Sequence, residues 1–190
     1  MERENVGGGD RGEGIGGYES LYGNTAAIGE AIAASLRERG MDVVAGPISR
    51  IESTAATGTD VLVAGGPTHA HGMSRAGTRR TGASDEKNRF AEPTVEPGLR
   101  EWLDALLAAA GRTAAPFDTR LNKPRALTGS AAKGIAKRLE RRGYRLVAEP
   151  ESFFVTGKNE LEDGEIDHAA RWAATVADRV RADAGAPVSR

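Results

Sequence analysis

The amino-acid sequence predicts an α/β domain in which a parallel sheet carries helices on both faces. Short apolar runs alternate along the chain with longer segments whose apolar residues recur at helical spacing, and this alternation is typical of such domains. Hydrophobic residues make up 39% of the sequence and aromatic residues only 5%, so the core must consist mainly of Ala, Val, Leu and Ile. A length of 190 residues suits one compact domain with short tails.

The chain begins with a glycine-rich segment that holds little apolar surface. Residues 1–17 include several charged side chains and only two β-branched residues, Val6 and Ile15. We therefore expect residues 1–13 to form a disordered tail and the domain to occupy residues 14–183. Residues 184–190 are expected to form a C-terminal tail.

A helix and two strands are expected in the next part of the chain. Apolar residues recur on one face of residues 26–39, and Gly40 follows where a helix C-cap is expected. Residues 41–45 and 60–64 are short and rich in valine, which predicts two strands. The second of these precedes Gly-Gly-Pro and is expected to be buried on both faces.

The middle of the chain predicts a long loop, a helix and a strand. Residues 71–97 are polar and lack apolar periodicity, so we expect a mobile surface loop there. An apolar stripe predicts a helix over residues 97–111, with Pro97 in its first turn. Residues 113–117 are a candidate strand.

The C-terminal part predicts two further helices around short strands. Ser130 can cap a helix that runs to Arg142, where Gly143 ends it. Residues 144–148 and 153–155 are candidate strands. Apolar residues from 166 to 180 then recur at helical spacing and predict a long final helix.

Composition excludes several classes of function. A net charge of −1 provides no global field of the kind expected for a nucleic-acid or anionic-membrane binder. The absence of cysteine excludes disulfides, Cys-ligated zinc or iron–sulfur sites, and thiol catalysis. No apolar run approaches the roughly 20 residues of a membrane-spanning helix, and the N-terminus lacks the apolar core of a signal peptide. We therefore expect a soluble cytoplasmic protein with no nucleic-acid or membrane partner.

The segment before the first helix contains the residues of a phosphate-binding turn. It reads Tyr-Glu-Ser-Leu-Tyr-Gly-Asn-Thr over residues 18–25. At a helix N-terminus several backbone N–H groups lack partners and the dipole is positive, so an anion can bind without a basic side chain. Ser20 and Thr25 add hydroxyl donors, and Gly23 permits close backbone approach. A capped helix start with a Gly-Asn turn explains the same residues without a ligand, so this turn alone leaves both interpretations open.

Two segments together resemble the flavodoxin family. Residues 18–25 (YESLYGNT) resemble its phosphate loop, and residues 65–72 (GGPTHAHG), which follow a buried strand, are similar to its second flavin-binding loop. The order of elements also follows the family to about residue 183. The resemblance implies a three-layer, doubly wound parallel five-stranded sheet in the order 2-1-3-4-5. It also implies noncovalently bound FMN that transfers one or two electrons through its ring.

The resemblance further implies which residues contact FMN. Those around the phosphate would be Ser20, Leu21, Tyr22, Gly23, Asn24 and Thr25. Those along the ribityl chain and one side of the ring would be Pro67, Thr68, His69 and Ala70, with His71 and Gly72 completing the loop. The family's third flavin loop follows the fourth strand, which points to residues 117–120, Phe117, Asp118, Thr119 and Arg120. Asp118 and Thr119 are the cofactor contacts expected from this loop. No residue is identified as catalytic.

The same resemblance places the first strand at the centre of the sheet, where a strand is buried on both faces. The residues at that position, 10–17 (DRGEGIGG), are mostly glycine and charge. Glycine has low strand propensity and no side chain to pack. We therefore expect a short strand within residues 14–19, a poorly filled centre, marginal stability and weakened FMN binding. A Val/Ile-rich replacement of residues 11–17 should then raise both stability and FMN affinity.

Other patterns match functional sites less well. Residues 12–17 spell G-x-G-x-x-G, but no apolar strand precedes them, and residues 129–134 lack the spacing of a P-loop. His69 and His71 have no third ligand in view, so we expect contact with flavin or solvent and no metal. Basic residues gather on and after one predicted helix: Lys133, Lys137, Arg138, Arg141, Arg142 and Arg145. A solvated face is expected there, with docking of an acidic redox partner or of NADPH as the alternative.

Three functions of different classes remain open. The first is an FMN-dependent electron carrier that exchanges electrons with a separate reductase and an acceptor protein. The second is an FMN-dependent NAD(P)H:quinone-type oxidoreductase in which residues 74–93 cover a substrate. The third is a flavin-free interaction module on the same scaffold. The carrier is favoured because no nicotinamide-binding motif is found.

Overall fold

The structure is a computed structural model that describes residues 12–69, 71–85, 88 and 90–185. Its strands are β1 (Glu13–Tyr18), β2 (Asp42–Pro47), β3 (Val61–His69), β4 (Gly72–Met73), β5 (Thr113–Leu121), β6 (Arg145–Leu146) and β7 (Glu151–Val155). They pair in the order β2-β1-β3-β5-β6, and β7 continues beside β5 beyond the end of β6. Because β6 and β7 share one position, the predicted five-position parallel sheet of order 2-1-3-4-5 is confirmed. β4 pairs antiparallel with the end of β3.

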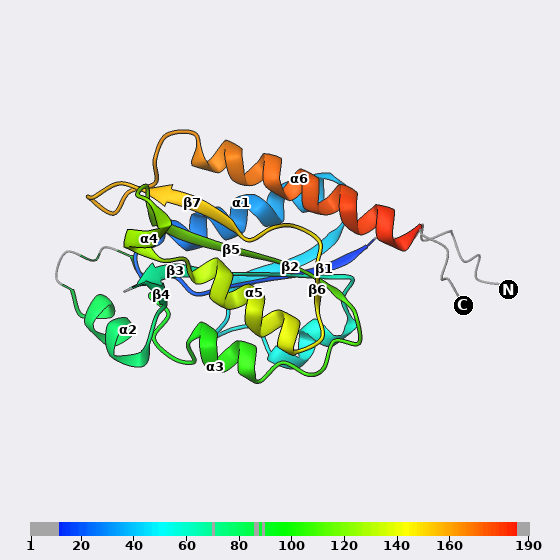
Figure 1. Cartoon of the computed structure of the whole chain (residues 1–190), viewed down its shortest axis with the longest axis horizontal. Coiled ribbons are helices and arrows are strands. Elements are labelled where there is room, and N and C mark those ends of the chain that lie inside the picture. Colours follow the sequence, from blue (N-terminus) through cyan, green and yellow to red (C-terminus); the bar gives the residue numbers. More distant parts are fainter. Residues whose placement is uncertain (1–11, 70, 86–87, 89, 186–190) are drawn as a thin grey trace, which may run out of the picture.

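Helices cover both faces of this sheet (Figure 1). α1 (Asn24–Glu38) and α6 (Glu165–Ala184) pack together on one face, and α3 (Leu99–Asp104) and α5 (Ala131–Arg141) lie on the other. Under α1 and α6 the core holds Phe117, Phe153 and Trp172, whose rings meet edge to face with centroids 6.0 to 6.3 Å apart. The opposite core is built mainly from leucine, isoleucine and alanine together with Trp102. The helix expected to begin at Ser130 and the long final helix are both confirmed.

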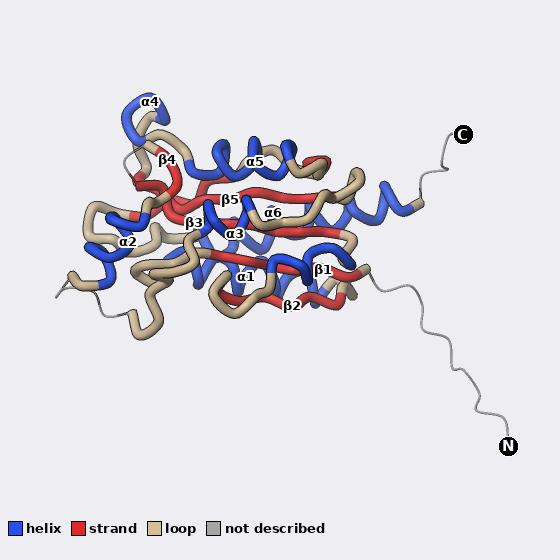
Figure 2. Tube along the Cα trace, turned by 90° about the horizontal axis from the view of Figure 1, so that it is seen from below, coloured by secondary structure: helices blue, strands red, loops and turns tan. Residues whose placement is uncertain are grey.

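The segment predicted as a loop, residues 71–97, contains β4 and the helix α2 (Ala76–Ala83). α2 lies at the same end of the sheet as α4 (Arg125–Thr128) (Figure 2). The loop prediction was wrong because the side chain that anchors α2 is an arginine, which an apolar pattern does not detect. Arg79 is only 1% exposed, and its Nε–H donates to the Val95 carbonyl at 2.7 Å.

Arg79 forms part of a buried polar cluster around Glu19, the residue that follows β1. The Arg79 Nη1 atom lies 3.9 Å from Glu19 Oε2, which also accepts a hydrogen bond of 2.8 Å from the Leu99 N–H. The Ser74 hydroxyl donates to the other carboxylate oxygen of Glu19. Burial raises the pKa of Glu19 above its ordinary value, although these partners oppose the shift. The cluster ties the end of β1 to α2 and α3.

Several elements differ in length from their predictions. β3 and β5 run on to His69 and Leu121, several residues beyond the expected strand ends. The helix expected over residues 97–111 is limited to α3, although Leu106 and Ala109 beyond it remain buried. Positive φ angles at Ala110 (48°) and Gly111 (85°) then turn the chain toward β5.

β1 is short and central, as predicted, because it pairs with β2 on one side and β3 on the other. The prediction that the centre of the sheet is poorly filled was wrong. A Cβ atom placed on Gly17 would lie 3.2 Å from Trp102 Cη2 and 3.3 Å from Ile48 Cγ2. One on Gly14 would lie 3.2 Å from Val43 Cγ2. Large side chains from neighbouring elements thus occupy the space over the glycines, and the G-x-G-x-x-G pattern belongs to this strand.

The predicted tails lie mostly outside the described residues, which exclude 1–11 and 186–190. Within the described part of the chain, Glu13 already belongs to β1, and α6 continues through Ala184. None of the helices in that part combines the length and apolar character needed to cross a membrane.

Candidate functional site

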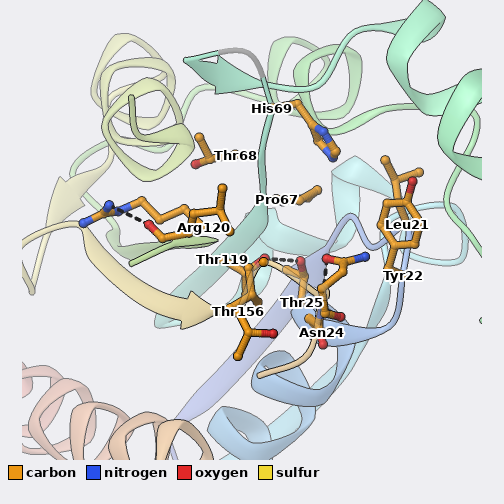
Figure 3. Close-up of a pocket in the computed structure, with 14 residues that line it drawn as sticks. Leu21, Tyr22, Asn24, Thr25, Pro67, Thr68, His69, Thr119, Arg120 and Thr156 are labelled. Carbon is orange, nitrogen blue, oxygen red and sulfur yellow. Dashed lines mark hydrogen bonds between the residues drawn. The ribbon is translucent and has the colours of Figure 1, made fainter. Parts of the chain in front are cut away.

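A cavity of about 220 Å³ opens at the carboxyl ends of the parallel strands, where open α/β sheets bind ligands. Four segments far apart in the sequence surround it: the turn before α1, the end of β3, the end of β5 and the turn after β7 (Figure 3). Its lining residues are Leu21, Tyr22, Asn24, Thr25, Pro67, Thr68, His69, Thr119, Arg120, Leu121, Val155, Thr156, Gly157 and Asn159. No carboxylate is among them, so the lining carries no negative charge.

The start of α1 forms the floor of the cavity. Gly23 precedes the helix with a φ of 93°, and no side chain in the described part of the chain caps the helix N-terminus. The first intrahelical bond runs from the Ala27 N–H to the Gly23 carbonyl at 2.9 Å. The N–H groups of Asn24, Thr25 and Ala26 therefore have no partner within the helix, and the first turn holds no acidic residue. This arrangement favours an anion at the helix start.

Two threonine hydroxyls meet beside this helix start. Thr25 Oγ1 and Thr119 Oγ1 are 2.7 Å apart, and both residues are buried. In such a pair one hydroxyl donates to the other, so the accepting hydroxyl keeps its own hydrogen for a further partner. Both residues line the cavity, and Thr119 brings the end of β5 against α1.

Ser20 and Gly23, by contrast, shape the turn and do not line the cavity. The Gly23 N–H donates to Ser20 Oγ at 3.1 Å, which closes the turn on itself. A Cβ atom on Gly23 would lie 3.0 Å from the Phe90 ring. A larger residue at this position would also have to adopt a positive φ. Both residues were predicted to contact the phosphate. In the structure they hold the backbone that presents Asn24 and Thr25.

The turn after β7 forms a wall that the sequence did not predict. Asn24 Nδ2 donates to the Asn159 carbonyl at 2.9 Å and lies 3.3 Å from Asn159 Oδ1. Asn159 has a φ of 63°, and Thr156 Oγ1 accepts from the Lys158 N–H at 3.2 Å. The signal was present, because Gly157 and Asn159 are turn-forming residues directly after a predicted strand, and every strand of a parallel sheet ends at this edge.

The end of β3 supplies a second wall from Pro67, Thr68 and His69, three residues for which the sequence predicts flavin contact. His69 Nε2 is buried and has no hydrogen-bond partner among the described residues. Burial also lowers the pKa of His69 below its ordinary value. His71 has a φ of 72° and pairs with Gly129, while Gly72 belongs to β4, so neither lines this cavity. Ala70 lies outside the described residues.

Asp118 was predicted to contact the cofactor, but the structure places it away from the cavity. It is fully buried, and Oδ2 accepts hydrogen bonds from Thr68 Oγ1 (3.0 Å), Ser130 Oγ (2.8 Å) and the Ala132 N–H (2.8 Å). It thus fastens the start of α5 to the sheet. The reason is strand alternation: β5 continues to Leu121, so Asp118 faces α5 while Thr119 faces α1.

Arg120 closes the side of the cavity nearest α4. Its Nη1 donates to the carbonyls of Leu121 (3.1 Å) and Lys123 (2.7 Å), and its guanidinium carbon lies 4.9 Å from the centre of the Phe154 ring. These contacts fix the chain that follows β5. Arg120 was placed in the third flavin loop from the sequence, and the structure carries it to the edge of the sheet within β5, because this strand is longer than expected.

Comparison with solved structures identifies the fold. Rubredoxin oxygen:oxidoreductase from the anaerobe Desulfovibrio gigas superposes with a TM-score of 0.66 and 16% identity, over 92% of this chain but only 37% of that protein. A flavodoxin from the domain Archaea superposes with a TM-score of 0.62 and 17% identity, over 89% of this chain and 99% of the other. Flavodoxin 1 from Bacillus cereus superposes with a TM-score of 0.64 and 18% identity, over 87% of this chain and 97% of the other. The fold is therefore flavodoxin-like.

Sequence comparison adds no closer relationship. No protein-family model and no curated protein sequence matches the chain.

Proposed function

We propose that the chain binds FMN in the cavity at the carboxyl edge of the sheet and serves in electron transfer. The observation that carries this proposal is the uncapped start of α1, which offers the N–H groups of Asn24, Thr25 and Ala26 to an anion beside the Thr25–Thr119 hydroxyl pair. Flavodoxins among the structural neighbours support a flavin as the ligand.

The residues present fit the phosphate end of FMN. Neutral donors surround the helix start, and among the described residues no carboxylate lines the cavity to repel an anion. Pro67, Thr68 and His69 then lie where the ribityl chain and one side of the ring would be held. A volume of about 220 Å³ is below the roughly 300–1,000 Å³ of small-molecule sites, so the cavity would enclose only part of FMN.

When bound, FMN supplies reversible one-electron and two-electron chemistry that no side chain provides. The protein's part is to hold the phosphate, position the ring and limit the access of water. We propose a cytoplasmic carrier that receives electrons from a separate reductase and passes them to an acceptor protein. NADPH alone should therefore leave the flavin of the holoprotein oxidised; rapid NADPH oxidation would favour the oxidoreductase instead.

The proposal is tested by titrating the purified protein with FMN and with riboflavin, which lacks the phosphate, and following flavin fluorescence. Charge-assisted hydrogen bonds contribute about 1.5–3 kcal/mol each, so FMN should bind at least about tenfold more tightly than riboflavin. Equal affinities would contradict the phosphate site. If neither flavin binds, the flavin-free interaction module becomes the better description.

A further inference from the structure

A short segment beside the cavity leaves apolar side chains exposed to solvent. We call residues 121–128, from the last residue of β5 to the end of α4, the α4 arm. Figure 2 shows α4 projecting from the body of the domain on the side of β4. Leu121 is 40% exposed and Leu127 is 66% exposed, and they are two of the five large hydrophobic residues that are exposed in the described part of the chain. The arm therefore gathers apolar surface that is covered only by water in the isolated protein.

One buried guanidinium holds both ends of the α4 arm. Arg120 is only 7% exposed. Its Nη1 donates to the carbonyls of Leu121 at 3.1 Å and Lys123 at 2.7 Å, near the start of the arm. The same Nη1 donates to Thr128 Oγ1 at 3.2 Å, at the end of the arm. The exposed leucines are therefore presented by a fastened backbone, so a partner that binds them has little chain to order.

The two exposed leucines border a hollow of about 200 Å³ between the arm and the end of β3. An apolar side chain of another protein that enters such a hollow is the kind of contact that contributes most to protein–protein affinity. Three of the lining residues, Thr68, Arg120 and Leu121, also line the main cavity, so the two sites adjoin. The full lining is Thr68, His71, Arg120, Leu121, Leu127 and Thr128.

The charges of the α4 arm are positive. Lys123 and Arg125 are both exposed, and the arm contains no acidic residue. Neither cation forms an ion pair with any residue that the structure describes. Glu162 contacts the arm by accepting a hydrogen bond of 2.9 Å from Asn122 Nδ2, and the arm together with Glu162 keeps a net positive charge. Unpaired cations around an apolar contact attract a partner of opposite charge and speed its association.

We propose that the α4 arm docks an acidic electron-transfer protein. An apolar side chain of this partner enters the hollow between Leu121 and Leu127, and its carboxylates pair with Lys123 and Arg125. The docking itself depends only on residues of the arm. Its meaning for electron transfer rests on the proposed function, because the flavin in the adjoining cavity is what would exchange electrons with the partner.

The test measures binding of an acidic plant-type ferredoxin to the full chain by calorimetry at low ionic strength. A basic cytochrome c is the control protein of opposite charge. The double variant Lys123→Glu/Arg125→Glu reverses the charge of the arm. The double variant Lys137→Glu/Arg141→Glu makes the same change in net charge at exposed positions of α5, so it separates a local docking surface from the total charge of the chain.

A second matched pair tests the apolar part of the surface. Leu127→Asn removes apolar surface from the arm, and Leu107→Asn removes it at a position 51% exposed in the segment after α3. All of these variants change exposed side chains, and urea denaturation midpoints equal to that of the unmodified chain verify folding.

We expect Lys123→Glu/Arg125→Glu to weaken ferredoxin binding at least about tenfold, because two attractions become repulsions. The α5 double variant should weaken it by less than about twofold, since its charges lie away from the docked partner and are screened. Leu127→Asn should weaken binding at least about fivefold, and Leu107→Asn should have no effect.

The proposal is overturned if ferredoxin does not bind, if cytochrome c binds equally well, or if the two members of either pair have equal effects. It is also overturned if the unmodified chain sediments as a dimer that Leu127→Asn dissociates, because a second copy then covers the arm.

Measurements with and without saturating FMN separate this proposal from the proposed function. If FMN fails to bind while ferredoxin binding still depends on the arm, the proposed function is rejected and the docking surface stands. If FMN binds while ferredoxin binding does not depend on the arm, the docking surface is rejected and the proposed function stands.

Discussion

Asn24 combines two roles in one residue. Its backbone N–H belongs to the uncapped start of α1, and its side chain is bonded to Asn159 in the turn after β7. The Gly23-Asn24 pair could be predicted from the sequence as a phosphate-binding turn. The turn that contains Asn159 has a local signal, but its hydrogen bond to Asn24 could not be predicted, because a contact across 135 residues leaves no local pattern.

Replacing Asn24 with aspartate should weaken FMN binding. The change puts a carboxylate beside the phosphate and removes the amide that donates to Asn159. Loss of a charge-assisted contact costs about 1.5–3 kcal/mol, so we expect FMN affinity to fall by about 10- to 100-fold in a fluorescence titration. Thr175→Asp adds the same charge on the exposed face of α6 and should leave the affinity unchanged. An unaltered affinity of Asn24→Asp would place the phosphate elsewhere.

Arg79 and Arg80 are neighbours on α2 with opposite environments, which makes them a matched pair. Arg79→Met leaves Glu19 buried without its cation and should lower the free energy of unfolding by about 3–5 kcal/mol. Arg80 is exposed and pairs with exposed Glu96 at 3.5 Å, so Arg80→Met should cost less than about 1 kcal/mol. Urea denaturation measures both values, and equal losses would show that the buried pair is not a stabilising link.

Glu19 should also give the stability a specific pH dependence. Burial raises its pKa in the folded state above the ordinary value of 4.5, so at pH values between the two the folded chain binds more protons at Glu19 than the unfolded chain does. The contribution of Glu19 to the free energy of unfolding is therefore greatest near pH 4.5 and falls as pH rises through the folded-state pKa. Urea denaturation of the unmodified chain and of Glu19→Gln over pH 4.5–8 isolates this contribution. A difference between them that stays constant with pH would contradict it.

At the scale of elements, the regular segments could be predicted and the packing between them could not. The helices after Ser130 and before the C-terminus follow from capping and periodicity. α2 does not, because its buried anchor is Arg79. The position at which β5 ends also determines which residues line the cavity. Because the strand continues to Leu121, Asp118 and Thr119 lie on opposite faces of the sheet, and of these two predicted residues only Thr119 lines the cavity.

β1 gives a direct test of packing over glycine. Gly17 pairs with Gly46 of β2, yet a Cβ on Gly17 meets Trp102 and Ile48, while one on Gly46 meets nothing within 4 Å. The Trp102 side chain cannot move away easily, because its Nε1–H donates to the Ile51 carbonyl at 2.7 Å. Gly17→Ala should therefore destabilise the chain by about 1–3 kcal/mol. Gly46→Ala should stabilise it by about 0.4–1 kcal/mol.

Urea denaturation of these two variants decides between filled and unfilled space at the centre of the sheet. The Val/Ile-rich replacement of residues 11–17, which the sequence alone favoured, should now lower stability, because it adds side chains where Trp102, Ile48 and Val43 already lie. A Gly17→Ala variant more stable than the unmodified chain would support the original prediction that the centre of the sheet around β1 is poorly filled.

For the molecule as a whole, FMN binding should appear as thermal stabilisation. A ligand at 100 times its Kd stabilises the native state by about 2.7 kcal/mol. For a chain of this size that corresponds to a rise in Tm of about 5–11 °C. Differential scanning calorimetry should detect this rise with FMN and a smaller one with riboflavin at the same concentration. Asn24→Asp should reduce the FMN effect, and identical shifts for both flavins would argue against a phosphate site.

The dispersal of the cavity walls along the chain has a consequence for biosynthesis. The turn before α1 is made first, and Asn159, which closes over it, is made 135 residues after Asn24. At translation rates of about 5–20 residues per second, this interval lasts about 7–27 s. During that time the nascent chain has a helix start but no complete pocket. If the cavity binds FMN, as we propose, the cofactor can be captured only after Asn159 has emerged, so its insertion would follow assembly of the sheet.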